Sequence, residues 1–198
     1  MYRKDKKQEF FTIKARKEGF PARSIYKLEE IDERFKIFKI GDRVLDLGCS
    51  PGSWLIYISR KVGVTGKVIG LDNQELSIKP GINTVFIKED VRNYQAHDLD
   101  QKGKFNSVVS DLAPSTSGVK SLDAGRSLEL CRVAFEIAKK YLIPEGNFVC
   151  KIFEGEESNE FIKEVGKNFK TIKRLRPRAV IKGSREFYIV AKDYQPNV

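Results

Sequence analysis

Apolar residues fall into short continuous runs that alternate with stretches of helical spacing. The runs predict buried strands over 43–47, 67–72, 84–87 and 107–111. Ile25, Leu28 and Ile31, spaced three residues apart, predict an amphipathic helix with Ser24 as its N-cap. Further helices are expected over 53–62 and 123–141.

The last third of the chain continues this alternation and then changes it. A strand is predicted over 146–153 and a helix over 161–168, followed by strands over 171–175 and 187–191 with no helix between them. Strands that alternate with helices imply βαβ units, whereas the final pair suggests an antiparallel hairpin. We therefore expect an α/β fold with a doubly wound, Rossmann-like sheet, mostly parallel with an antiparallel last strand.

Charge divides the chain into a centre and two ends. Lys and Arg number 37 against 27 Asp and Glu, for a formal net charge of +10 and a pI near 9.4. Residues 1–27 hold nine basic and three acidic side chains, and residues 163–198 hold ten and three. The middle is mildly acidic. Basic ends indicate a polyanionic partner, although a generally basic, solvated surface would have the same composition. We expect residues 1–22 to form a basic arm and residues 23–198 a single domain.

Several classes of protein are disfavoured at this stage. No apolar run approaches the ~18–20 residues of a membrane span, and the N-terminus has no apolar core typical of a signal peptide. The cysteines, Cys49, Cys131 and Cys150, lack metal or redox spacing, so we expect a cytoplasmic protein without a metal site. His97 is the only histidine and is expected in a loop. Acid–base chemistry must therefore depend mainly on Lys, Asp, Glu or Tyr.

Acidic residues end successive predicted strands, next to a glycine turn. Gly48 and Gly52 allow the backbone to turn tightly and approach a ligand, in a G-x-x-x-G spacing that does not build a phosphate cradle. Asp72 is placed to accept hydrogen bonds from ribose hydroxyls, and Asp90 to face an adenine amino group. Each aspartate alone is typical of a turn. Together they favour an adenosine ligand without pyrophosphate, and S-adenosylmethionine is the common one; a dinucleotide-dependent oxidoreductase is the weaker reading.

Five separated motifs resemble those of the FtsJ/RrmJ family of ribose 2′-O-methyltransferases, in the family's order. They span about Arg23 to Lys192 and read Arg23-Ser24-x-x-Lys27-Leu28, Asp46-Leu47-Gly48-x-x-Pro51-Gly52-x-Trp54, Ser110-Asp111-x-Ala113-Pro114-x-x-Ser117-Gly118, Lys151-x-Phe153-x-Gly155 and Ser184-Arg185-Glu186-x-Tyr188-Ile189-Val190-Ala191. Two positions depart from the family pattern. Ser53 stands where a second glycine is usual, and the loop after Asp72 lacks a common proline.

The resemblance implies a cofactor site and a catalytic set. It assigns S-adenosylmethionine contacts to Gly52, Trp54, Asp72, Asp90 and Asp111, beside the close approach expected at Gly48. It also implies a tetrad in which Lys151 is the base and Asp111 its partner, while Lys27 and Glu186 orient the hydroxyl. Independently of the resemblance, a lysine inside the apolar stretch 148–153 is unusual for a buried strand and suggests a functional role. A lysine can serve as a base once its pKa falls toward neutrality.

The substrate expected from the resemblance is ribosomal RNA within the large subunit, methylated at a uridine ribose by a monomeric enzyme. The RNA-binding residues are expected at both basic ends: Lys14, Arg16, Arg23, Arg176, Arg178, Lys182 and Arg185. Phe10, Phe11, Phe20 and Tyr26 either stack on unpaired bases or anchor the arm. The alternatives are a tRNA or mRNA-cap ribose methyltransferase and a non-catalytic RNA-binding factor of ribosome assembly.

Overall fold

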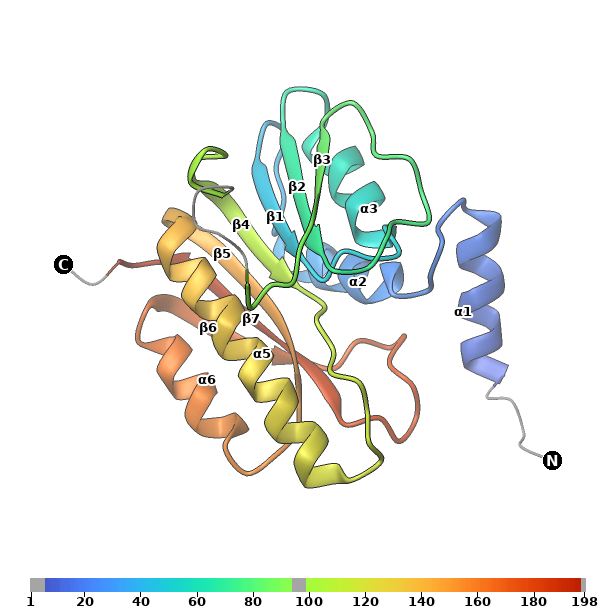
Figure 1. Cartoon of the computed structure of the whole chain (residues 1–198), viewed down its shortest axis with the longest axis vertical. Coiled ribbons are helices and arrows are strands. Elements are labelled where there is room, and N and C mark those ends of the chain that lie inside the picture. Colours follow the sequence, from blue (N-terminus) through green and yellow to red (C-terminus); the bar gives the residue numbers. More distant parts are fainter. Residues whose placement is uncertain (1–5, 94–98, 197–198) are drawn as a thin grey trace.

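The computed structural model describes residues 6–93 and 99–196, and His97 lies outside this part of the chain. Helices and strands alternate along most of it (Figure 1). The helices are α1 (Lys6–Lys17), α2 (Ile25–Phe35), α3 (Ser53–Val62), α5 (Lys120–Tyr141) and α6 (Ser158–Gly166). The strands are β1 (Arg43–Leu47), β2 (Lys67–Asp72), β3 (Thr84–Lys88), β4 (Phe105–Ser110), β5 (Leu142–Phe153), β6 (Phe169–Leu175) and β7 (Glu186–Tyr194).

The strands form a seven-stranded sheet in the order β3-β2-β1-β4-β5-β7-β6. β1 to β5 are parallel to one another, and β7 runs antiparallel to both β5 and β6. From β1 the chain adds β2 and β3 on one side of the sheet, and it then returns to add β4 and the later strands on the other side of β1. The strand order therefore reverses between β1 and β4. Ligands of such sheets bind beyond the carboxyl ends of the strands at this reversal. The expected fold class, including the antiparallel last strand, is confirmed.

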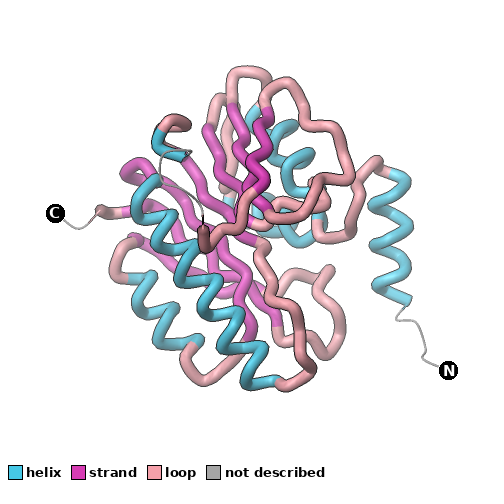
Figure 2. Tube along the Cα trace, in the orientation of Figure 1, coloured by secondary structure: helices cyan, strands magenta, loops and turns pink. Residues whose placement is uncertain are grey.

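Helices cover the two faces of the sheet (Figure 2), and an apolar layer lies on each face. One is packed with side chains of α5 and α6, including Phe135 and Phe161. The other is packed with α2 and α3, including Leu28 and Ile58, and extends to Ala15 of α1. Successive strand residues alternate between these layers because side chains of a strand point to opposite faces.

Some sequence predictions need correction. Ser24 is the N-cap residue of α2, as predicted, although its side chain makes no capping hydrogen bond. β5 starts at Leu142 rather than at the predicted residue 146, so it contains Pro144, and its register against β4 shifts between Phe105 and Ser107. The connection from β2 to β3 contains no helix, although strict alternation would place one there.

The basic N-terminal segment contains a helix that the apolar pattern did not predict. α1 stands at the flank of the domain (Figure 1). Ala15 is buried against the core, whereas Phe10 is 60% exposed. The helix is therefore held mainly through its last turns.

Candidate active site

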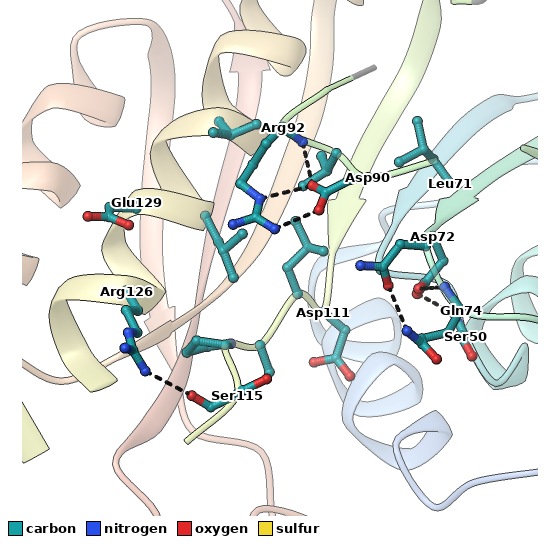
Figure 3. A pocket seen from close by; sticks show the side chains of 18 residues that line it. Ser50, Leu71, Asp72, Gln74, Asp90, Arg92, Asp111, Ser115, Arg126 and Glu129 are labelled. Carbon is teal, nitrogen blue, oxygen red and sulfur yellow. Dashed lines mark hydrogen bonds and ion pairs between the residues drawn. The ribbon is translucent and has the colours of Figure 1, made fainter. Parts of the chain in front are cut away.

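A cavity of about 830 Å³ opens at the carboxyl edge of β1, β2 and β4, where the strand order reverses (Figure 3). Asp72 at the end of β2, Asp90 after β3 and Asp111 after β4 all contribute to its wall. Gly48 and Ser50 line it from the turn after β1, and Arg126 and Glu129 from α5. The structure thus brings together three of the predicted aspartates and one of the predicted glycines.

The turn after β1 requires glycine at two positions. Gly48 has φ +79°, and a Cβ there would lie 3.0 Å from the backbone nitrogen of Leu112. Gly52 has φ +113°, and a Cβ there would lie 2.5 Å from Cγ1 of Ile78. Any side chain would combine backbone strain with a close contact. Gly48 lines the cavity, whereas Gly52 precedes α3 and is not among the lining residues.

Asp72 is held in place by two backbone amides. Its Oδ2 accepts a hydrogen bond from the Ser50 amide at 2.8 Å, and its Oδ1 accepts one from the Gln74 amide at 2.8 Å. These bonds fix the carboxylate at the rim of the cavity, and its remaining lone pairs are available to hydroxyl donors. This arrangement suits the ribose contact predicted for Asp72.

Asp90 forms an ion pair with its neighbour Arg92. The guanidinium donates to Oδ1 at 3.0 Å and to Oδ2 at 2.6 Å, and the Arg92 amide donates to Oδ1 at 2.9 Å. These bonds to Arg92, the side-chain bond first, lower the pKa of Asp90 to about 2. The Asp90 carboxylate is therefore ionised and already accepts hydrogen bonds from Arg92, so an adenine amino group would be a further donor to it.

Asp46 lies in β1 beneath the cavity and is completely buried. Neither carboxylate oxygen has a hydrogen-bond partner among residues 6–93 and 99–196. Burial, followed by the nearby charges of Asp111 and Asp72, raises the pKa of Asp46 well above its usual value. A raised pKa favours the protonated, uncharged form of Asp46, so the acidic character that fits a cationic ligand comes from Asp72 and Asp111.

The four predicted catalytic residues form two ion pairs. Lys151 Nζ lies 3.0 Å from Oδ1 of Asp111 and donates to the Asp111 carbonyl at 2.5 Å. Lys27 Nζ of α2 lies 2.5 Å from Oε1 of Glu186 at the start of β7. The Lys151 side chain is only 6% exposed, so its ammonium is not a snorkelling surface charge. Asp111 links the pairs to the cavity because it also lines its wall.

Tyr188 joins the two ion pairs, and sequence reasoning assigned it no role. Its hydroxyl donates to Oδ1 of Asp111 at 2.6 Å, and Lys27 Nζ lies 5.9 Å from its ring centroid. Burial would raise the pKa of Asp111, but Lys151, Lys27 and the Tyr188 hydroxyl outweigh it and lower that pKa. The available signal was the spacing of Tyr188 two positions after Glu186, on the same face of β7.

Trp54 lies away from the cavity wall. It is 3% exposed, its indole N–H donates to the Ser24 carbonyl at 3.0 Å, and its ring lies 6.1 Å from that of Tyr188. Ser53, at the position that departs from the family pattern, exchanges two hydrogen bonds with the backbone of Ala22. Both residues therefore fasten the segment before α2, which carries Lys27, to the start of α3.

The predicted RNA-binding residues lie in three places. Lys14 and Arg16 belong to α1, Arg23 precedes α2, and Arg176, Arg178, Lys182 and Arg185 lie in the connection from β6 to β7. The Arg178 amide donates to Oε2 of the buried Glu30 in α2 at 2.7 Å. The β6–β7 connection is thereby held against the helix that carries Lys27.

The aromatic residues of the N-terminal segment separate into two groups. Phe11 lies 5.2 Å from Tyr26, centroid to centroid, and Phe20 is buried with Arg60 over its ring. These three residues anchor the segment to the domain. Phe10, in contrast, remains exposed.

The sheet is mostly parallel, and the strand reversal carries a glycine turn, an acidic rim and a buried lysine–aspartate pair. This combination is that of a Rossmann-like methyltransferase. The chain belongs to the FtsJ-like methyltransferase family, whose model matches residues 20–194. This confirms the family indicated by the motifs. No helix in the described part of the chain is long and apolar enough to cross a membrane.

Several relatives match nearly the whole chain. It is 47% identical over 184 residues to "Ribosomal RNA large subunit methyltransferase E" of Desulfatibacillum aliphaticivorans, covering 92% of this chain and 89% of that protein. It is 41% identical over 187 residues to the protein of the same name from Bdellovibrio bacteriovorus, covering 92% and 95%. A crystal structure of a Plasmodium falciparum protein described as a ribosomal RNA methyltransferase superposes with a TM-score of 0.80 at 26% identity, covering 90% of this chain and 100% of the other.

Proposed function

We propose that this enzyme transfers a methyl group from S-adenosylmethionine to a ribose 2′-oxygen, expected to be that of a uridine, in large-subunit ribosomal RNA. The observation that carries the proposal is the buried Lys151–Asp111 pair, in which Asp111 also lines the cavity. One residue thus connects the group that would receive a proton with the site that would hold a methyl donor. The names of the relatives support ribosomal RNA of the large subunit as the substrate.

The residues of the cavity suit S-adenosylmethionine. Asp72 presents an amide-fixed carboxylate for ribose hydroxyls, and Gly48 lets the ligand approach the backbone. The carboxylates of Asp72 and Asp111 line the cavity and give it an acidic character that favours a cation. When bound, this cofactor supplies a methyl group already activated on a sulfonium.

The side chains of the tetrad would then prepare the ribose hydroxyl. In its neutral form, the Lys151 amine accepts the hydroxyl proton as the oxygen attacks, and Asp111 stabilises the ammonium that results. The Lys27–Glu186 pair holds the hydroxyl in line, because a displacement requires alignment of the reacting atoms. Tyr188 positions Asp111 through its hydroxyl.

The proposal assigns catalysis and RNA binding to different parts of the chain, which also differ in charge. Residues 23–198 are the catalytic domain, and the basic residues of 1–22 and of the β6–β7 connection contact RNA phosphates. Contact from the connection is supported by its attachment to α2, which places it beside Lys27 and Glu186.

Methyl transfer to defined RNA particles tests the proposal. The purified enzyme is incubated with S-adenosylmethionine labelled in its methyl group and with unmodified large subunits, small subunits or tRNA. We expect the label only in RNA of the large subunit. Label in tRNA alone would favour the tRNA enzyme instead, and tight binding of the cofactor and of RNA without any transfer would indicate a non-catalytic assembly factor.

A further inference from the structure

A second cavity, of about 410 Å³, lies beyond the end of β5 and before the start of β7. Its walls come from the first turns of α5, the end of β5, the start of α6 and Arg185. Figure 1 shows these elements meeting at the lower edge of the molecule. It shares no lining residue with the first cavity and is therefore a separate site.

The second cavity begins next to the tetrad. Phe153, in its wall, pairs across the sheet with Glu186, and Arg185 directly precedes Glu186. Lys151 lies two positions before Phe153, about 7 Å along the strand. A strand of RNA with one ribose at Lys151 would therefore carry a neighbouring nucleotide over this cavity.

The wall suits a nucleobase better than a phosphate. Ala124, Leu128 and Phe153 provide an apolar floor, whereas the Glu156 carboxylate at the rim would repel an anion. Glu157, also at the rim, pairs with Arg132 at 3.8 Å. Carboxylates accept hydrogen bonds from the amino groups of bases. A flat, partly apolar group with amino donors matches both features.

Arg185 is fixed in a position that can support stacking. Its guanidinium donates to the carbonyl of Lys120 at 2.6 Å and lies 3.4 Å from that of Glu154. The side chain therefore bridges the start of α5 and the end of β5. Unpaired bases in RNA stack on aromatic rings and on guanidinium planes, and the cavity offers Phe153 and Arg185 for these contacts.

We propose that the second cavity binds the base of a nucleotide adjacent to the one that is methylated. This rests on the proposed function, since it takes RNA as the substrate. The base leaves its stack and enters between α5 and β5, and this fixes the neighbouring ribose at Lys151. Orienting the ribose through a neighbour would lower the KM for RNA without any contact to the cofactor.

Gly125 allows the cavity to be filled without disturbing the fold. It lies in α5 at the cavity wall, and a Cβ added there meets no atom within 4 Å. Gly125→Phe would place a ring in the opening, and Gly125→Ala is its matched control. Both substitutions also favour the helix, because glycine is the poorer helix former.

The experiment compares three proteins, wild type and these two variants, on unmodified large subunits. We expect Gly125→Phe to weaken binding of the subunits and to raise the KM at least tenfold, with the dissociation constant for S-adenosylmethionine unchanged within twofold. Gly125→Ala should match the wild type in each measurement. Equal binding by both variants would overturn the inference.

Binding is measured separately from transfer, so that the two proposals fail separately. A wild type that binds subunits but transfers no methyl group would overturn the proposed function. The comparison of binding by the two variants would still show whether the cavity binds RNA. Conversely, normal transfer and normal binding by Gly125→Phe would retain the proposed function and exclude the base site.

Discussion

Lys151 is a charged side chain inside an otherwise apolar strand. Its neighbours Cys150 and Ile152 are fully buried, and its own ammonium reaches both the carboxylate and the carbonyl of Asp111. Burying such a pair costs desolvation that the pair itself only partly offsets. A position of this kind is better explained by chemistry than by stability.

Replacing Lys151 should separate catalysis from cofactor binding. Lys151→Met keeps a long side chain but removes the amine, so methyl transfer should fall at least ~100-fold, the lower range for loss of a general base. The dissociation constant for S-adenosylmethionine, measured by calorimetry, should change less than about threefold. Lys173→Met, at an exposed position of β6, is the control and should retain full transfer. Loss of cofactor binding with surviving transfer would contradict the assigned role.

Asp46 should make stability depend on pH. Its pKa is raised in the folded state, so the folded protein holds the proton more tightly than the unfolded chain does. Stability is therefore lost as the pH rises from the unfolded pKa of about 3.9 through the folded value.

Asp46→Asn removes this ionisation while keeping the shape of the side chain. Without ligand, its midpoint of thermal unfolding should exceed that of the wild type at pH 7–8, by about 2–4 °C for each kcal/mol gained, and the gain should shrink toward pH 4. Glu33→Gln, at an exposed position in α2, should show no such gain. A uniform loss of stability at every pH would show that Asp46 is ionised and favourably placed.

The residues that could be predicted are those whose type conflicts with their surroundings. A lysine in an apolar strand and aspartates at strand ends stand out in the sequence, and the structure brings them together. Tyr188 does not stand out, because an aromatic residue in a strand is ordinary until its hydroxyl is seen at Asp111. Trp54 was expected at the cofactor; it is not among the residues that line the cavity, and its indole N–H donates to the Ser24 carbonyl.

At the scale of elements, continuous apolar runs predicted the central strands because a parallel sheet is buried on both faces. The pattern is less informative where burial is partial. α1 buries Ala15 but leaves Phe10 and Ile13 exposed, so its sequence has no clear apolar stripe. The first residues of β5 were not predicted as strand because they include Pro144. Proline is tolerated there because the register of β5 against β4 is irregular at that point.

Glu30 links α2 to the β6–β7 connection and should contribute more to stability than the exposed Glu33 of the same helix. It is 6% exposed, and it accepts the Arg178 amide at 2.7 Å while pairing with Arg34 at 2.7 Å. Glu30→Ala leaves the amide without its acceptor, so the free energy of unfolding should fall by about 1–3 kcal/mol.

The measurement is urea unfolding, with Glu33→Ala as the exposed control on the same helix. The control should stay within about 0.5 kcal/mol of the wild type. Because the connection carries basic residues, Glu30→Ala should also raise the KM for RNA. Equal effects of the two substitutions would show that the connection does not depend on Glu30.

At the scale of the whole molecule, acidic and basic side chains are concentrated in different parts of the structure. The carboxylates of Asp72, Asp90 and Asp111 line the cavity, while basic side chains occupy α1 and the β6–β7 connection. Such a separation allows a cationic cofactor and an anionic RNA to approach one catalytic centre.

Salt dependence should show which basic residues meet phosphates. Removing one phosphate contact reduces the slope of log K against log salt concentration by about one. Lys182→Glu, in the exposed β6–β7 connection, should weaken RNA binding and flatten this slope. Lys163→Glu carries the same charge change on α6 and should leave the slope unaltered. Identical slopes for both variants would place the phosphates elsewhere.

The position of the transferred methyl group tests the central claim most directly. Large subunits methylated by the purified enzyme are stripped of protein, and their RNA is hydrolysed with alkali, which cannot cleave beside a 2′-O-methylated ribose. Mass spectrometry should find one alkali-resistant dinucleotide from large-subunit RNA, absent when Lys151→Met replaces the wild type. A methyl group found on a base, with the RNA fully cleaved, would contradict the account.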